Sequence, residues 1–152
     1  MDHGRVPSRA FAARALVSGA MSHHRDPVTA PGAPDAVGPY SHAVRSAGLL
    51  FCSGQTPLDP ATGKLVEGSI GDQTRRCLEN LQLVCAAAGA ELSDAVRLGV
   101  YVIDMGTFPE VNEAYAAFFG EGPPARSTIG VASLPLGAAV EIDAIVALPS
   151  QM

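Results

Sequence analysis

The sequence has few cysteines, few lysines and no long apolar run. Its 152 residues include three cysteines, Cys52, Cys77 and Cys85, an odd number with no C-x-x-C pair. The sequence therefore indicates neither a disulfide framework nor a cysteine zinc site, and it suggests a reducing compartment. No apolar run approaches the roughly 20 residues that span a bilayer, and Arg14 interrupts the apolar stretch at 10–20. We expect a cytoplasmic protein with no membrane partner.

Basic residues are also scarce. The whole chain has 10 Lys and Arg against 15 Asp and Glu, a formal net charge of −5. From residue 27 onward there are 6 Lys and Arg, of which one is Lys, against 13 Asp and Glu, a formal net charge of −7. Nucleic-acid binders draw much of their affinity from basic side chains that contact phosphates. The charge balance therefore argues against nucleic acid as a general partner.

The composition favours one folded domain, because 47% of the residues are hydrophobic and 16% are charged. Residues 1–28 differ from the rest, since they hold four of the Arg and three of the four His. We predict a flexible N-terminal tail at 1–28 and a single domain at 29–152. An Arg-rich, acid-poor start is typical of an organelle transit peptide, but Met21 offers a second account, an over-long reading frame with its real start there. We favour the second account.

Two helices are predicted from patterns of period 3.6. The first carries a buried stripe, with Ser69 as its N-terminal cap and Gly89 at its end. The second begins at Thr107, where Thr-x-x-Glu110 reads as a capping box, and stops at Gly120.

Strands are predicted where apolar residues alternate or cluster between turn residues. The first two form a hairpin around Ala47-Gly48, after a loop rich in proline and glycine. The expected order is strand 41–45, strand 49–53, helix 70–88, strand 96–103, helix 107–119, strand 126–134 and strand 138–148.

This order predicts an α+β fold in which two amphipathic helices cover one face of a mixed sheet. The other face also carries apolar residues, including Ile103, Ile145 and Ala147. In a chain of this length, packing against a partner subunit is the simplest way to bury that face. We therefore expect an oligomer.

Common catalytic motifs are missing: the sequence has no P-loop, no H-E-x-x-H and no G-x-S-x-G. Outside the tail the single histidine is His42, which reads as structural, and no metal site is expected. Arg126 follows Pro123-Pro124-Ala125, which fixes its backbone. Its guanidinium suits bidentate binding of a carboxylate, although a solvated surface arginine explains the same pattern.

Glu141 and Asp143 share one face of the last strand, opposite Val140 and Ile142. They are either part of a solvated face or acids in a cleft between subunits. In a covered cleft, desolvation would raise the pKa of such a carboxylate and suit it to exchanging protons with water. Cys52-Ser53-Gly54-Gln55 ends a strand in a glycine, which allows a ligand close to the backbone or simply forms a turn.

Six segments together resemble the RidA/YjgF family in order and spacing. They are Gly38-Pro39-Tyr40, Cys52-Ser53-Gly54-Gln55, Val111-Asn112-Glu113-Ala114-Tyr115, Pro124-Ala125-Arg126-Ser127, Leu134-Pro135 and Val140-Glu141-Ile142-Asp143-Ala144, within about residues 30–148. The resemblance implies a chorismate-mutase-like α+β domain and a homotrimer with sites between subunits. It also implies a hydrolase, a deaminase that converts reactive 2-imino acids, the products of pyridoxal-phosphate enzymes, to 2-oxo acids and ammonia.

The resemblance further assigns roles to single residues. It implies that Arg126 binds the substrate carboxylate and that Glu141 activates the attacking water and moves protons. Tyr40 would line the cleft from a neighbouring subunit, and Ser53 and the Gly54 backbone would contact the imine end. No cofactor is implied, because an imine carbon is already electrophilic.

Two further positions are carried over with looser roles. Asn112 matches a family position near the site. Thr128 stands where many members have Cys, so any role for a thiol there is absent, and activity should survive if that position acts through its backbone. The alternative functions are ligand binding and regulation, or RNA cleavage as a translation inhibitor, and the acidic charge counts against RNA.

Overall fold

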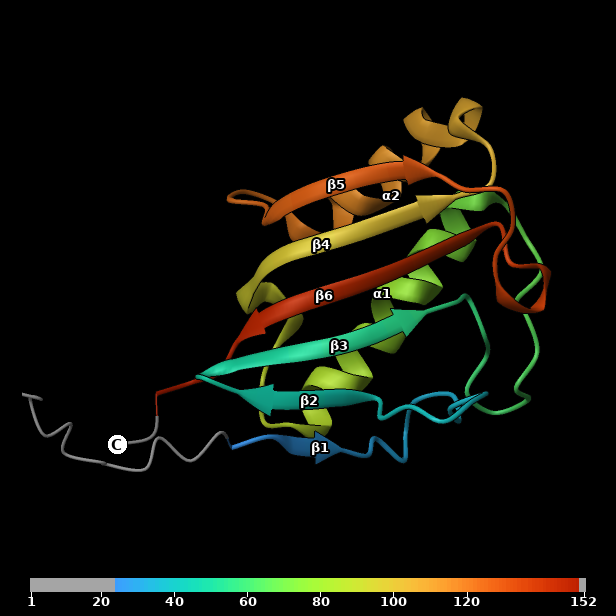
Figure 1. Cartoon of the computed structure of the whole chain (residues 1–152). Helices are drawn as coiled ribbons and strands as arrows, with labels where there is room; N and C mark the ends of the chain where they lie inside the picture. Colours follow the sequence, from blue (N-terminus) through green and yellow to red (C-terminus); the bar gives the residue numbers. More distant parts are fainter. Residues whose placement is uncertain (1–23, 151–152) are drawn as a thin grey trace, which may run out of the picture.

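The predicted α+β layout is confirmed by the computed structural model, which describes residues 24–150 (Figure 1). Within these residues six strands form one sheet in the order β1-β2-β3-β6-β4-β5. All neighbouring strands are antiparallel except β4 and β5, which are parallel. The strands are β1 (Asp26–Val28), β2 (Ala43–Ser46), β3 (Leu49–Gln55), β4 (Ala95–Val102), β5 (Ala125–Gly130) and β6 (Val140–Ala147).

The edge strand of the sheet, β1, lies inside the expected tail. Strand β1 pairs with β2 through Asp26–Val28, so regular structure begins before residue 29, and this strand was not predicted. Arg45 of β2 secures it, donating to Asp26 at 2.8 Å and to the Ala88 carbonyl at 3.1 Å. Met21 and the rest of the expected tail, residues 1–23, lie outside the described residues.

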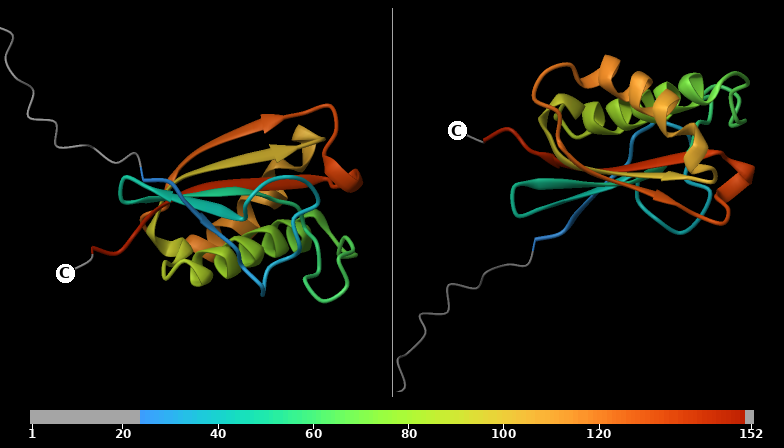
Figure 2. Two further views of the ribbon diagram at one scale, coloured as in Figure 1. Left: turned by 60° about the horizontal axis from the view of Figure 1, so that its bottom comes forward. Right: turned by 90° about the horizontal axis from the view of Figure 1, so that it is seen from above.

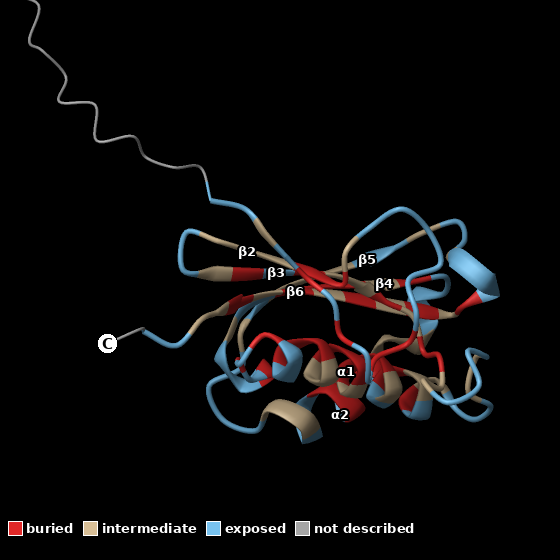
Figure 3. Cartoon of the chain, turned by 90° about the horizontal axis from the view of Figure 1, so that it is seen from below, coloured by how far each residue is buried: buried red, intermediate tan, exposed pale blue. Residues whose placement is uncertain are grey.

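Both helices, α1 (Ile70–Ala87) and α2 (Phe108–Phe119), pack on the same face of the sheet (Figure 2). The buried residues gather between this face and the helices (Figure 3). Alternate residues of the central strands point into this core; they include Leu50, Leu98, Val100, Val102, Val140, Ile142 and Val146. Among the described residues no helix is long and apolar enough to cross a membrane.

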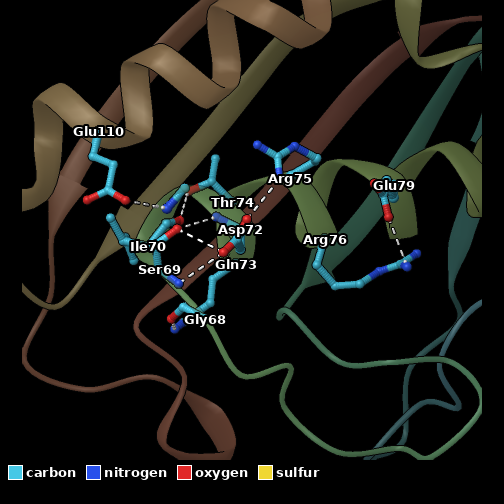
Figure 4. A network of polar contacts seen from close by, with 11 residues as sticks. Gly68, Ser69, Ile70, Asp72, Gln73, Thr74, Arg75, Arg76, Glu79 and Glu110 are labelled. Carbon is cyan, nitrogen blue, oxygen red and sulfur yellow. Dashed lines mark hydrogen bonds and ion pairs between the residues drawn. The ribbon is translucent and has the colours of Figure 1, made fainter.

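The predicted cap of α1 is confirmed, and it is a complete capping box (Figure 4). The Ser69 hydroxyl accepts from the backbone N–H of Asp72 at 3.1 Å, and the Asp72 carboxylate accepts from the Ser69 N–H at 3.1 Å. The Ser69 N–H, the Ser69 hydroxyl and the Arg75 side chain donate to the Asp72 carboxylate and hold its pKa below the ordinary value. Two otherwise unpaired donors of the first turn are thereby satisfied.

The predicted capping box of α2 is wrong. A single 3₁₀ turn at 105–107 precedes the helix, so Thr107 has helical backbone angles and its side chain makes no cap bond. Its hydroxyl donates instead to the Asp104 carbonyl at 2.7 Å. Glu110 turns away to accept from the Gly71 N–H of α1 at 3.2 Å, which ties the two helices together (Figure 4).

The second face of the sheet carries no helix in the described part of the chain (Figure 2). Large apolar side chains stand on it in exposed positions, with 43% of Phe51 and 49% of Ile129 accessible to solvent. Strand register places Ile145 beside Phe51 and Tyr101 beside Ile129 on the same face. We call this surface the open face.

Candidate functional site

Arg126 enters the structure from the second position of β5 and lies on the helix side of the sheet. Its register partner is Leu98, which is fully buried under the helices. The guanidinium donates to Asn112 Oδ1 at 2.8 Å. It also lies over two aromatic rings of α2, 4.6 Å from the Tyr115 centroid and 5.6 Å from that of Phe108. Three side chains of helix α2 therefore orient the guanidinium.

No carboxylate neutralises this arginine within the described residues. Asn112 is a neutral acceptor and uses one of the five N–H donors of the guanidinium. Arg126 lines a cavity of about 310 Å³ together with Asn112, Tyr115, Pro123 and Pro124. A fixed, uncompensated cation beside a cavity suits a small carboxylate.

Glu141 belongs to a second cavity, of about 280 Å³, at the open face. Tyr40, Ser53 and Gly54 line this cavity with it, as do Val37, Thr56 and Pro135. The Glu141 side chain lies directly over Gly54, where a methyl group would come within 2.9 Å of the carboxyl carbon. The glycine is thus needed for this carboxyl to fold down onto β3. Four residues predicted for the site are brought together here.

The environment of Glu141 fits a proton-transfer role. Burial raises the pKa of its carboxyl above the ordinary value, and the charge of Asp143 adds to the effect. No hydrogen bond or ion pair engages this carboxylate within residues 24–150. Ser53 is less available, because its hydroxyl donates to the Ser41 carbonyl at 2.6 Å. A half-buried carboxyl without a fixed partner can bind water and exchange protons with it.

The two cavities do not merge within one protomer. Arg126 shares the helix side of the sheet with Leu98, whereas Glu141 alternates with the buried Val140 and Ile142 and points to the open face. Within one protomer, Arg126 and Glu141 therefore line separate cavities on opposite sides of the sheet.

Thr128 lies two residues beyond Arg126 on the same side of β5, but it lines neither cavity. Its hydroxyl is buried and has no hydrogen-bond partner among the described residues, as is also true of the Tyr115 hydroxyl. Burial raises the pKa of Tyr115, and the nearby Arg126 partly offsets this. A side-chain role for Thr128 in binding substrate has no support from this placement.

Sequence reasoning missed the aromatic support of Arg126. Phe108 and Tyr115 were not predicted as part of the site, yet with Asn112 they have the spacing i, i+4, i+7 of one helix face. That shared spacing with a polar residue was the available signal. It also missed Tyr101, whose hydroxyl donates to Asp143 Oδ2 at 3.0 Å on the open face.

His42 has the structural role that was predicted. Its ring is buried, with Nδ1 accepting from the Ala30 N–H at 3.1 Å and Nε2 2.8 Å from the Pro34 carbonyl. It therefore anchors the loop that leads to Tyr40. In the part of the chain that the structure describes, no group of three His, Cys, Asp or Glu side chains could hold a metal ion.

Comparison with known proteins shows similarity over nearly all of the described chain. The family model described as Endoribonuclease L-PSP matches residues 30–148. The RutC family protein PH0854 of Pyrococcus horikoshii is 47% identical over 113 residues, which cover 74% of this chain and 90% of that protein. A protein of Dermatophagoides farinae named 2-iminobutanoate/2-iminopropanoate deaminase is 38% identical over 121 residues, covering 80% of this chain and 94% of that one.

The fold is also similar to solved structures. The crystal structure of E. coli TdcF with bound serine superposes with a TM-score of 0.77 at 35% identity, and the match covers 82% of this chain and 99% of that one.

Proposed function

Because this chain belongs to the Ribonuc_L-PSP family, the YjgF/RidA family, we propose that it hydrolyses reactive 2-imino acids to 2-oxo acids and ammonia. The substrates are 2-iminobutanoate and 2-iminopropanoate, which the name of the Dermatophagoides relative also gives. The observation that carries the proposal is the Arg126 guanidinium, which is fixed by α2, unpaired with any described acid and open to a cavity.

The residues divide the reaction between them. Arg126 binds the substrate carboxylate through paired N–H donors and so fixes the position of the adjacent imine carbon. Glu141 takes a proton from the attacking water and returns one to the departing nitrogen. Addition of water gives a carbinolamine, and loss of ammonia leaves the 2-oxo acid. Tyr40, Ser53 and Gly54 line the Glu141 cavity, and in this proposal they contact the imine end of the substrate.

We propose further that the active form is a homotrimer whose site combines the Arg126 cavity of one protomer with the Glu141 cavity of the next. The support is the position of these residues on opposite sides of the sheet and the apolar open face, which a neighbouring protomer would cover.

The first experiment generates 2-iminobutanoate in situ with an amino-acid oxidase and follows its disappearance. Wild-type protein should accelerate the decay without any added cofactor, and Arg126→Ala should lose most of the acceleration. Full activity in this variant would refute the assigned mechanism. If a folded wild-type oligomer does not accelerate the decay, the same cavity binds a carboxylate ligand without turnover or acts on another substrate.

A second experiment tests the shared site. Arg126→Ala and Glu141→Gln protomers are each inactive in the proposal, so they are unfolded, mixed in equal amounts and refolded. Random trimers then contain intact sites at about one quarter of their interfaces, and about one quarter of the wild-type activity should return. A site contained within one protomer would return none.

A further inference from the structure

Two acidic side chains project from β6 onto the open face, and each leans toward a different neighbouring strand. Glu141 lies over Gly54 of β3, as described above. Asp143 lies over Gly99 of β4, where a methyl group would be 2.5 Å from Asp143 Oδ1. The two glycines therefore provide the space in which one carboxyl leans toward β3 and the other toward β4.

The two carboxyls differ in how they are held. Asp143 Oδ1 accepts from the Gly99 backbone N–H at 3.0 Å, and Oδ2 accepts from the Tyr101 hydroxyl at 3.0 Å. Two donors to one carboxylate fix its position. Glu141 has no such donors within the described residues. The open face thus carries one anchored negative charge beside one unanchored carboxyl.

Within the same protomer, no other described group places a positive charge against the Glu141 carboxyl. Tyr101 is its register partner on β4, and Tyr40 shares its cavity from the preceding loop. Arg97 of β4 donates to Ser127 of β5 instead, at 3.2 Å. Below the sheet, Cys77 of α1 is buried, and burial raises the pKa of its thiol. Within one protomer, the charge that acts on Glu141 is therefore that of Asp143: burial raises the pKa of the Glu141 carboxyl, and Asp143 adds to the effect. In the proposed trimer, Arg126 of the neighbouring protomer faces the same site with the opposite sign of charge.

We propose that Asp143, held by Gly99 and Tyr101 two residues from Glu141 on the same face of β6, is a positioning residue for the proton transfers of Glu141 during imine hydrolysis. This inference rests on the proposed function. Hydrolysis must take a proton from water and deliver one to the departing nitrogen. A carboxyl that holds its proton closer to the working pH performs both transfers better than an ordinary glutamate.

The test compares Asp143→Asn with Tyr101→Phe in the full chain. Asparagine has nearly the shape of aspartate: its oxygen can accept from the Gly99 N–H, and its amide nitrogen can donate to the Tyr101 oxygen. This variant removes the charge and keeps the contacts. Tyr101→Phe removes one contact and keeps the charge, so it is the matched control.

The first readout is the titration of the Glu141 carboxyl carbon by ¹³C NMR, assigned by its loss in Glu141→Gln. In Asp143→Asn the midpoint should shift to lower pH, and in Tyr101→Phe it should stay close to wild type. The proposal is overturned if Asp143→Asn leaves the midpoint unchanged, or if Tyr101→Phe shifts it equally. This readout does not depend on activity.

The second readout is the pH profile of kcat/KM for 2-iminobutanoate. In Asp143→Asn, the part of the profile that is governed by ionisation of Glu141 should move to lower pH. The plateau value of KM should stay unchanged, because Arg126 is untouched. A shifted NMR titration with an unshifted profile would overturn the role in hydrolysis. A wild-type protein that titrates as expected but does not hydrolyse the imine would refute the proposed function and leave the coupling between the two acids established.

Discussion

Arg126 donates to the amide oxygen of Asn112 at 2.8 Å, so the arginine of the candidate site is held by a neutral acceptor. An acid in that place would orient the guanidinium equally well but would cancel its charge. An amide fixes the orientation of the planar guanidinium and leaves its full positive charge available to a ligand. The faces of Tyr115 and Phe108 add orientation in the same way, without a counter-charge.

This relationship predicts the effect of Asn112→Asp. The new carboxylate should pair with Arg126 and compete with the substrate carboxylate, which should raise KM by about tenfold or more, with a smaller effect on kcat. Asn112→Ala is the control, because it removes the orienting bond without adding charge and should raise KM less. Steady-state kinetics on 2-iminobutanoate measure both, and equal KM values for the two variants would contradict the argument.

Gly54→Ala should impair catalysis without unfolding the protein. The added methyl group would meet the Glu141 carboxyl carbon at 2.9 Å, and the carboxyl must move away from its position over β3. Displacement of a catalytic group by about 1 Å can cost on the order of 10²-fold in rate. We expect a loss of this order in kcat.

The matched control is Gly32→Ala, whose methyl group would meet only Leu83 at 3.9 Å. It should retain wild-type kcat. Circular dichroism and thermal unfolding of both variants separate a local effect from misfolding. A fully active Gly54→Ala variant would show that Glu141 does not need its observed position.

Thr128→Val should leave the protein active and at least as stable as wild type. The Thr128 hydroxyl is buried without a partner in the described residues, and valine has nearly the same shape. Removing an unsatisfied buried hydroxyl is neutral or stabilises a protein by about 1 kcal/mol. Urea unfolding at fixed protein concentration and the imine assay give the two readouts. A loss of stability or of most activity would mean that the hydroxyl finds a partner in the assembled protein.

Local patterns predicted most of the fold because the information lies within each segment. Ser69 and Asp72 are three residues apart, and they form their capping box without help from distant parts of the chain. The second capping box failed for the opposite reason. The Glu110 carboxylate accepts instead from the N–H of Gly71, which is 39 residues away in the sequence. Only the packing of α2 on α1 brings these two residues together.

The edge strand β1 was not predicted, for a similar reason. Its three residues include Pro27 and show no alternation of their own, and its place depends on pairing with Ala43–Arg45. For the site, the resemblance named residues such as Arg126 and Glu141 but not their separation on the two sides of the sheet. That separation follows from strand register, which the order of segments does not reveal.

The raised pKa of Glu141 has a consequence for stability. Burial and Asp143 raise this pKa above its ordinary value of 4.5, so the folded protein keeps the proton to a higher pH than the unfolded chain does. Between the two pKa values the folded state binds more protons, and the free energy of unfolding therefore falls as pH rises through this window. Above the folded pKa the loss is complete and constant. The ionised glutamate thus destabilises the fold that holds it.

Glu141→Gln should remove this cost, because glutamine has the same shape and no charge. We expect the variant to be more stable than wild type at pH 7 to 8 and the difference to vanish below about pH 4, where both states of the wild type are protonated. Urea unfolding across this pH range, at one protein concentration, measures the difference. Glu121→Gln, at an exposed position, controls for the removal of one negative charge. A Glu141→Gln variant that is less stable than wild type at pH 8 would mean that the ionised carboxylate has a stabilising partner in the assembled protein.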